Sequence, residues 1–171
     1  MLQISSHLKT QIEHAAVSAY PLECCGLMLG QRLQGQDYDT ESDSRQVVEF
    51  VPADNQWDGS VQDITDPTEP SSPGPTTKLD RHRRYWIDPN IMLKVQRGAR
   101  DRKLDIIGIY HSHPDHPAVP SECDRRLAWP VYSYVIVSAA AGGATDFRSW
   151  RLSSDHQFES EAVKIVDKIC P

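Results

Sequence analysis

The order of apolar and polar residues predicts two long helices and several buried strands. Between Ser6 and Ala19 apolar residues recur at helical spacing, which predicts an amphipathic helix ending near Pro21. A second helix is predicted to begin at Pro89, with Asp88 as its N-terminal cap. Its C-terminal half is basic, which favours the helix dipole or marks a partner surface. Short apolar runs predict strands at residues 21–30, 46–51, 104–110 and 131–138, and a segment rich in polar and aromatic residues predicts another at 145–152.

Three other segments are less regular. Between Pro52 and Arg84 lie five of the twelve prolines, with many Ser, Thr and Asp residues. This composition predicts a long insertion at about 52–84, which fits either a surface loop or a flap near a site. Residues 122–129 predict a short helix that stops at Pro130. Residues 158–169 fit a strand or a last helix, and we favour the strand.

The composition is that of one ordinary globular domain covering residues 1–171. Charged residues make up 25% and hydrophobic residues 39% of the chain. The net charge of −6 does not favour binding to nucleic acid or to an anionic membrane surface. No apolar run approaches the about 20 residues that span a bilayer, and the N-terminus lacks a signal peptide's apolar core. We therefore expect a cytosolic protein with reduced cysteines.

Two histidines at the end of the strand at 104–110 are the strongest candidate site. His111 and His113 are two residues apart, so on an extended strand their side chains share a face. Asp124 offers a third ligand. Two histidines, one carboxylate and an open fourth position form the ligand set of a catalytic zinc site, not of a closed structural one. The run from Ser121 to Asp124 is also the pattern of a helix capping box, and both interpretations can hold at once.

A glutamate opens the apolar segment that follows Pro21. This residue, Glu23, carries a carboxylate that must be solvated, paired or functional in such a position. A solvated glutamate in a turn is the simplest interpretation, and a role in a site is the alternative. Cys24 and Cys25 follow it and would alternate faces on a strand, so we assign both to packing.

The order and spacing of these residues resemble the JAMM (MPN+) metalloprotease family, in particular its small stand-alone bacterial members. The resemblance is carried by Glu23, the run His111-Ser112-His113-Pro114, and Ser121 and Asp124 downstream. It extends through residues 87–89, 107–110 and 134–138, and so covers most of the chain outside the 52–84 insertion. The resemblance implies an α/β (α+β) fold, with a mixed curved β-sheet flanked by helices of the cytidine-deaminase-like type.

The resemblance also implies a function. It implies Zn2+ held by His111, His113 and Asp124, and hydrolysis of a peptide or isopeptide bond. The expected substrate is a ubiquitin-like or sulfur-carrier protein, cleaved after its C-terminal Gly-Gly. Zinc would lower the pKa of a bound water toward about 7. Glu23 would act as the general acid–base group, and Ser121 could donate a hydrogen bond to the tetrahedral oxyanion.

Two other functions stay open. One is a binding module that keeps the fold as a scaffold, although a scaffold has no physical need for a water-open zinc site. The other is a zinc amidohydrolase or deaminase acting on small molecules, which fits the ligands but lacks the deaminase signature. The chain also contains no H-E-x-x-H helix, P-loop or G-x-G-x-x-G turn.

Overall fold

The computed structural model describes residues 1–33, 43–57 and 81–167. Its helices and strands, in chain order, are β1 (Leu2–Ser5), α1 (Ser6–Ala19), β2 (Cys25–Leu33), β3 (Ser44–Ala53), α2 (Pro89–Arg100), β4 (Asp105–Pro114), α3 (Glu122–Leu127), β5 (Ser133–Ala140), β6 (Gly143–Leu152), β7 (Phe158–Glu161) and β8 (Val163–Val166). Within these residues no helix is long and apolar enough to cross a membrane.

The eight strands form one mixed sheet in the order β7-β6-β5-β4-β2-β3-β1-β8. Three neighbouring pairs are parallel, namely β4 with β5, β1 with β3 and β1 with β8, and the other four are antiparallel. The outermost strands β7 and β8 are separated in the chain by Ala162 alone, whose carbonyl accepts from the Leu2 N–H at 2.9 Å. The sheet therefore curves until its edges nearly meet, which confirms the predicted fold class.

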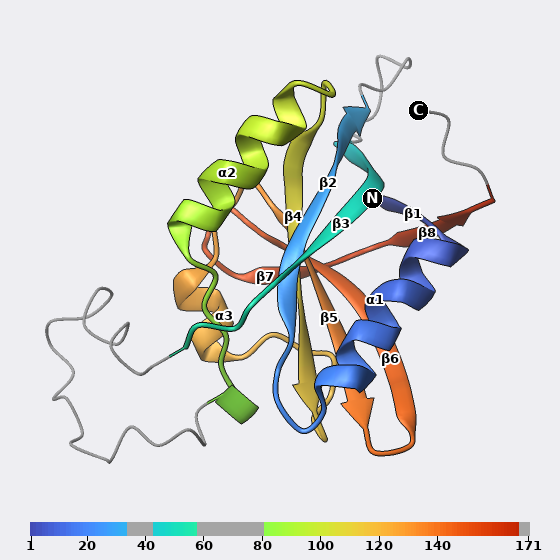
Figure 1. Ribbon diagram of the computed structural model, residues 1–171, viewed down its shortest axis with the longest axis vertical. Helices are drawn as coiled ribbons and strands as arrows, with labels where there is room; N and C mark the ends of the chain where they lie inside the picture. Colours follow the sequence, from blue (N-terminus) through green and yellow to red (C-terminus); the bar gives the residue numbers. More distant parts are fainter. Residues whose placement is uncertain (34–42, 58–80, 168–171) are drawn as a thin grey trace, which may run out of the picture.

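Helices α1 and α2 lie on opposite sides of this sheet (Figure 1). One stripe of α1 is buried, through Leu8, Ile12 and Ala16, which recur every four residues. On the other side α2 packs through the buried Ala99 and the partly buried Met92. Because helices cover both faces, the central strands β4 and β5 are buried along nearly their whole length.

The structure confirms most predicted elements and changes several boundaries. α1 spans the predicted residues, and α2 begins at Pro89 as predicted, with the Asp88 side chain accepting from the Asn90 N–H at 2.7 Å. α3 ends at Leu127, two residues earlier than predicted. The C-terminal segment forms strands, as favoured, but two short ones at opposite edges of the sheet. The sequence did not indicate β1, because four residues are too few to show a period.

The predicted insertion at 52–84 is narrower than the sequence indicated. β3 continues through Ala53. Beyond it Trp57 is 3% exposed, and the Gln56 N–H donates to the Trp86 carbonyl at 3.0 Å. Residues 54–57 and 81–84 therefore belong to the packed domain. Residues 58–80 lie outside the described residues, so their interpretation as a loop or a flap stays a prediction.

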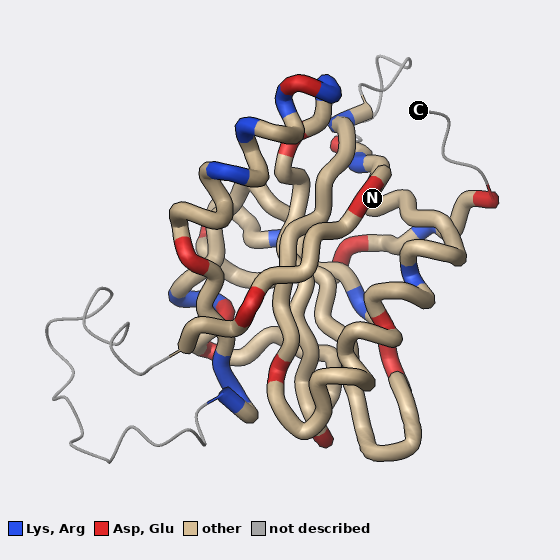
Figure 2. Tube along the Cα trace, viewed as in Figure 1, with Lys and Arg blue, Asp and Glu red and all other residues tan. Residues whose placement is uncertain are grey.

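Positive charge is concentrated along α2 and the turn that follows it (Figure 2). Arg97 and Arg100 lie in the last turn of the helix, where cations favour the helix dipole. Arg102, in the following turn, forms an ion pair with Glu49. These contacts support the structural interpretation of the charge, and its use as a partner surface stays a prediction.

Candidate metal centre

β4 carries both histidines within the strand, not after it. The strand extends through Pro114 and is hydrogen-bonded to β2 on one side and β5 on the other. In this ladder His111 lies between Cys25 and Ile136. His111 is fully buried, and His113 is 8% exposed. The two-residue spacing places both imidazoles on one face, as predicted, and the neighbouring strands fix the direction in which they point.

Asp124 comes from the first turn of α3, where a capping box holds it. The Ser121 hydroxyl accepts from the Asp124 N–H at 3.1 Å. In return, the Ser121 N–H and hydroxyl donate to Asp124 Oδ2 at 2.6 and 2.7 Å. The capping-box interpretation is therefore confirmed. With Oδ2 held in this way, the carboxylate is fixed in one orientation beside the histidines.

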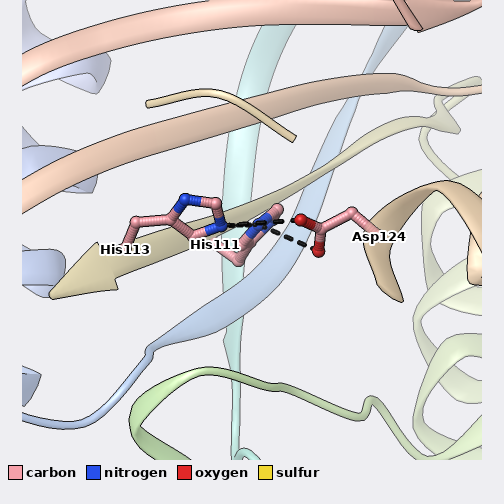
Figure 3. A group of neighbouring side chains, drawn as sticks. All are labelled: His111, His113 and Asp124. Carbon is pink, nitrogen blue, oxygen red and sulfur yellow. Dashed lines mark hydrogen bonds and ion pairs between the residues drawn. The ribbon is translucent and has the colours of Figure 1, made fainter. Parts of the chain in front are cut away.

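The three side chains point toward one another (Figure 3). Nε2 of His111 and Nε2 of His113 are 3.0 Å apart. Oδ1 of Asp124 is 3.3 Å from the first, and Oδ2 is 3.5 Å from the second. Zinc bonds of about 2.0–2.2 Å in a tetrahedron separate neighbouring ligand atoms by about 3.3–3.6 Å. The two nitrogen–oxygen distances fall in this range and the Nε2–Nε2 distance is somewhat shorter, so the two imidazoles and the carboxylate lie close enough to hold one zinc ion. Among the described residues, these three form a group that could bind a metal.

The orientation of the histidine rings also suits a metal. Nδ1 of His113 lies 2.9 Å from the Pro117 carbonyl. Because a carbonyl oxygen can only accept, Nδ1 donates to it, and Nε2 is the ring nitrogen that faces the other two side chains. Burial lowers the pKa of His111 below 6.5, against the charge of Asp124, which raises it. The His111 ring stacks on Tyr85, with ring centroids 4.4 Å apart.

The carboxylate of Asp124 is held in its charged form. Burial by itself would raise the pKa of Asp124, but His111 and hydrogen bonds from His113 and Ser121 keep it well below 3.8. Two imidazole nitrogens and one ionised carboxylate are the donors of a catalytic zinc site. The residues present therefore fit the ion.

Glu23 lies in the turn before β2, in the wall of the cleft that reaches the metal centre. The residue is 4% exposed, so the simple interpretation as a solvated glutamate is wrong. Burial, with a smaller contribution from the charge of Asp124, raises the pKa of Glu23 from 4.5 to about 9. The cleft has a volume of about 440 Å³, and its walls also contain Arg83, His113, His116, Pro117, Val119 and Ser121.

A second pocket, lined mainly by apolar side chains, lies beside Asp124. Its volume is about 280 Å³, and its lining includes Tyr85, Trp86, Met92, Leu127, Trp129 and Tyr134. Arg83 lines both this pocket and the cleft, so it stands where the two meet. Sequence analysis did not predict this pocket, because its walls come from three separate segments of the chain. Tyr85, which stacks on His111, belongs to one of them.

Comparison with known families agrees with this geometry. The chain matches the prokaryotic homologs of the JAB domain over residues 5–153. It belongs to this family. The matched range contains the predicted site residues Glu23, His111, His113, Ser121 and Asp124. The resemblance to the JAMM family, drawn above from the sequence, is therefore confirmed.

Two curated proteins are similar to parts of the chain. A desampylase from Haloferax volcanii is 29% identical over 119 residues, which are 69% of this chain and 63% of that protein. The "Probable TtuB-protein conjugate cleaving protease" from Thermus thermophilus is 43% identical over 53 residues, 30% of this chain and 35% of that protein. The chain therefore spans less than two thirds of the length of these JAB-domain relatives.

Solved structures share the fold over nearly the whole chain. A protein from Desulfitobacterium hafniense, solved in solution, has a TM-score of 0.69 at 25% identity, covering 99% of this chain and 95% of that one. A JAB1/MPN domain protein from Archaeoglobus fulgidus has a TM-score of 0.50 at 18% identity, covering 97% and 99%. The second similarity concerns the fold alone, and it is the JAB1/MPN fold that the sequence predicted.

Proposed function

We propose that this protein is a zinc-dependent peptidase or isopeptidase that cleaves after the C-terminal Gly-Gly of a ubiquitin-like or sulfur-carrier protein. The observation that carries the proposal is the buried group of His111, His113 and Asp124, with Glu23 in the wall of the same cleft. A structural zinc site has four protein ligands. Among the described residues this group offers three, which leaves a position for water.

The proton transfers fall to Glu23. Zinc bound at this centre would polarise the scissile carbonyl and favour ionisation of the attacking water. Glu23 accepts a proton from that water on its carboxylate and later donates it to the leaving amine. Burial raises the pKa of Glu23, which suits the donating step, and a nearby cation favours the charged form that accepts.

The pocket beside Asp124 and the cleft beside Glu23 together suit the extended C-terminal tail of such a substrate. The apolar pocket beside Asp124 would take an apolar side chain before the scissile bond, and the cleft beside Glu23 would take the residue after it. A chain running from one hollow to the other passes Arg83. Glycines at the reacting carbonyl would bring no side chain to the point where the pocket and the cleft meet. Similarity to a desampylase and to a conjugate cleaving protease supports a protein conjugate as the substrate.

Ser121 has a second proposed role besides holding Asp124. Its single hydroxyl proton is donated to Asp124 Oδ2. To stabilise an oxyanion, as the sequence led us to expect, the hydroxyl has to rotate toward the cleft that Ser121 lines. The N–H of Ser121 continues to hold Asp124 when this happens, because it makes a separate hydrogen bond. The proposed location of this activity is the cytosol.

The direct test uses small ubiquitin-like sulfur carriers extended past Gly-Gly, with intact-mass detection. We expect cleavage after the second glycine, its loss with a chelator, and its recovery with Zn2+. In the matched variant Glu23→Gln we expect unchanged zinc content and turnover reduced at least about 100-fold. Cleavage that a chelator does not affect would refute the metal, and full activity of the variant would refute the base. No cleavage with one zinc bound per chain would contradict the substrate.

A further inference from the structure

We infer that Asn55 is a positioning residue that holds the backbone of Glu23 in register with the metal centre. The inference rests on the proposed function, because that function makes Glu23 the general base. Asn55 is partly buried and lies just after β3, in the part of the predicted insertion that the structure describes.

The turn that carries Glu23 is held from outside the sheet ladder. β2 begins only at Cys25, so Glu23 has no strand partner of its own. The Glu23 N–H donates to the Arg81 carbonyl at 2.9 Å. On its other side the Glu23 carbonyl accepts from Asn55 Nδ2 at 3.2 Å. Both polar backbone groups of Glu23 are therefore bound by the segments 54–57 and 81–86.

Asn55 uses the whole hydrogen-bonding capacity of its side chain. Nδ2 donates to the carbonyls of Glu23 and Arg84, the latter at 2.9 Å. Oδ1 accepts from the N–H groups of Trp57 and Trp86 at 3.1 and 3.2 Å. A primary amide has two N–H donors and an oxygen with two lone pairs, so every position is filled. Aspartate has the same shape but no donor, and therefore cannot replace asparagine here.

Three of these four bonds connect Glu23 to the metal centre. Arg84 and Trp86, which Asn55 holds, flank Tyr85, whose ring stacks on His111 with an interplanar angle of 25°. Asn55 thus joins the turn of the base to the segment that packs against a metal ligand. The β4 ladder and the capping box of Asp124 do not involve Asn55. Its loss should therefore release Glu23 and leave the three ligands in place.

Two variants and one control separate these effects in the full-length, zinc-loaded protein. Asn55→Asp keeps the two acceptor bonds and removes both donors, and Asn55→Ala removes all four. Asn90→Ala is the control, because Asn90 is the other asparagine of the chain and its side chain donates to Asp88 at 3.0 Å, at the start of α2. If Asn55→Ala does not fold, the nearly isosteric Asn55→Asp decides the question.

The first measurement determines kcat and KM separately on a carrier extended past Gly-Gly, together with the zinc content per chain. We expect kcat to fall about 10- to 100-fold in both Asn55 variants, because a displacement of about 1 Å costs on that order. KM should stay within about threefold, since substrate contacts are unchanged. Zinc content and the Asn90→Ala protein should match the wild type. An unchanged kcat, or a loss of kcat that follows a loss of zinc, would overturn the inference.

The second readout is amide hydrogen exchange measured by NMR, which needs no substrate. We expect exchange at the Glu23 amide to accelerate at least about tenfold in both Asn55 variants, while the Ile109 amide in β4 is unaffected. The Trp86 amide, which donates to Asn55 Oδ1, should exchange faster only in Asn55→Ala. Unchanged exchange at Glu23 would overturn the inference. If the wild type cleaves no carrier, the proposed function fails, and hydrogen exchange alone then decides whether Asn55 holds Glu23.

Discussion

Ser112 and Cys24 hold each other through two hydrogen bonds. The Cys24 N–H donates to the Ser112 hydroxyl at 2.9 Å, and the Ser112 N–H donates to the Cys24 carbonyl at 3.1 Å. Ser112 is the residue between the two histidines, and Cys24 is the residue after Glu23. The side chain that points away from the metal centre thus ties the strand of the ligands to the turn of the proposed base.

Ser112→Ala should weaken both stability and turnover. The variant leaves the Cys24 N–H without the hydroxyl, which costs about 1–3 kcal/mol of unfolding free energy in a buried place. We expect kcat to fall roughly tenfold, because Glu23 is adjacent to the released group. Urea unfolding and steady-state kinetics measure the two effects. Ser18→Ala, at an exposed position of α1, should change stability by less than about 0.5 kcal/mol. Equal behaviour of the two variants would contradict the role of the Ser112 bond.

Ser121→Ala should lower metal affinity as well as stability. Removing the cap of α3 should cost about 1 kcal/mol, and freeing Asp124 Oδ2 should weaken zinc binding about 10- to 100-fold. Competition with a chromophoric chelator measures the affinity. The matched control is Ser5→Ala, because the Ser5 side chain caps α1 by accepting from the Leu8 N–H. We expect that control to lose similar stability with unchanged zinc affinity. Equal affinity in all three proteins would show that the capping box does not orient the ligand.

Gly26 should not tolerate a side chain. A Cβ added there would lie 2.4 Å from a ring carbon of Tyr110 and 2.5 Å from the Val51 carbonyl oxygen. Gly26→Ala should therefore destabilise the protein by about 1–3 kcal/mol, as overpacking does in cores. Gly98→Ala should instead stabilise it by about 0.5–1 kcal/mol, since nothing lies within 4 Å of that Cβ and the site is in a helix. Thermal unfolding of both variants tests the pair, and destabilisation by both would contradict the open space at Gly98.

The stability of the metal-free protein should fall as the pH rises. Burial raises the pKa of Glu23 from 4.5 to about 9, so the folded state keeps a proton in this window that the unfolded chain has released. The free energy of unfolding then decreases with pH, by up to about 1.4 kcal/mol per unit from this one group. Glu23→Gln lacks this contribution, so its stability should depend less on pH. Urea unfolding between about pH 6 and 9 measures the difference, and parallel curves for the two proteins would argue against the raised pKa.

Local patterns in the chain were sufficient to predict the helices and to predict that both histidines point to the same face of their strand. Helical spacing gives α1 with its observed bounds. Strand alternation is a property of neighbouring residues, so the shared face of His111 and His113 follows from their spacing. The capping box of α3 is likewise a four-residue pattern. Asp124, by contrast, was proposed as a third ligand from its residue type, and Glu23 was joined to the site through a family resemblance, because nothing local says that residues 23, 111 and 124 meet.

Local sequence patterns could not predict the short strands or the residues that hold the site in place. β1, β7 and β8 have four residues each, and their partners lie far away in the chain. Asn55 lies in a proline-rich segment with no period, and its bonds go to residues on three different stretches. Glu23 is also held by residues 54–57 and 81–86, which bind the N–H and the carbonyl of its backbone.

The sequence by itself determined the secondary structure of the central elements, the candidate ligands and the family, because these depend on spacing between residues close in the chain or on a fixed order of motifs. The tertiary structure alone decided that the sheet curves until its edges nearly meet, that Glu23 is buried, and that Ser112 and Asn55 hold its turn from two sides. Each of these depends on contacts between distant segments. Hydrogen bonds and burial of that kind form only when the whole domain packs, so no local pattern encodes them.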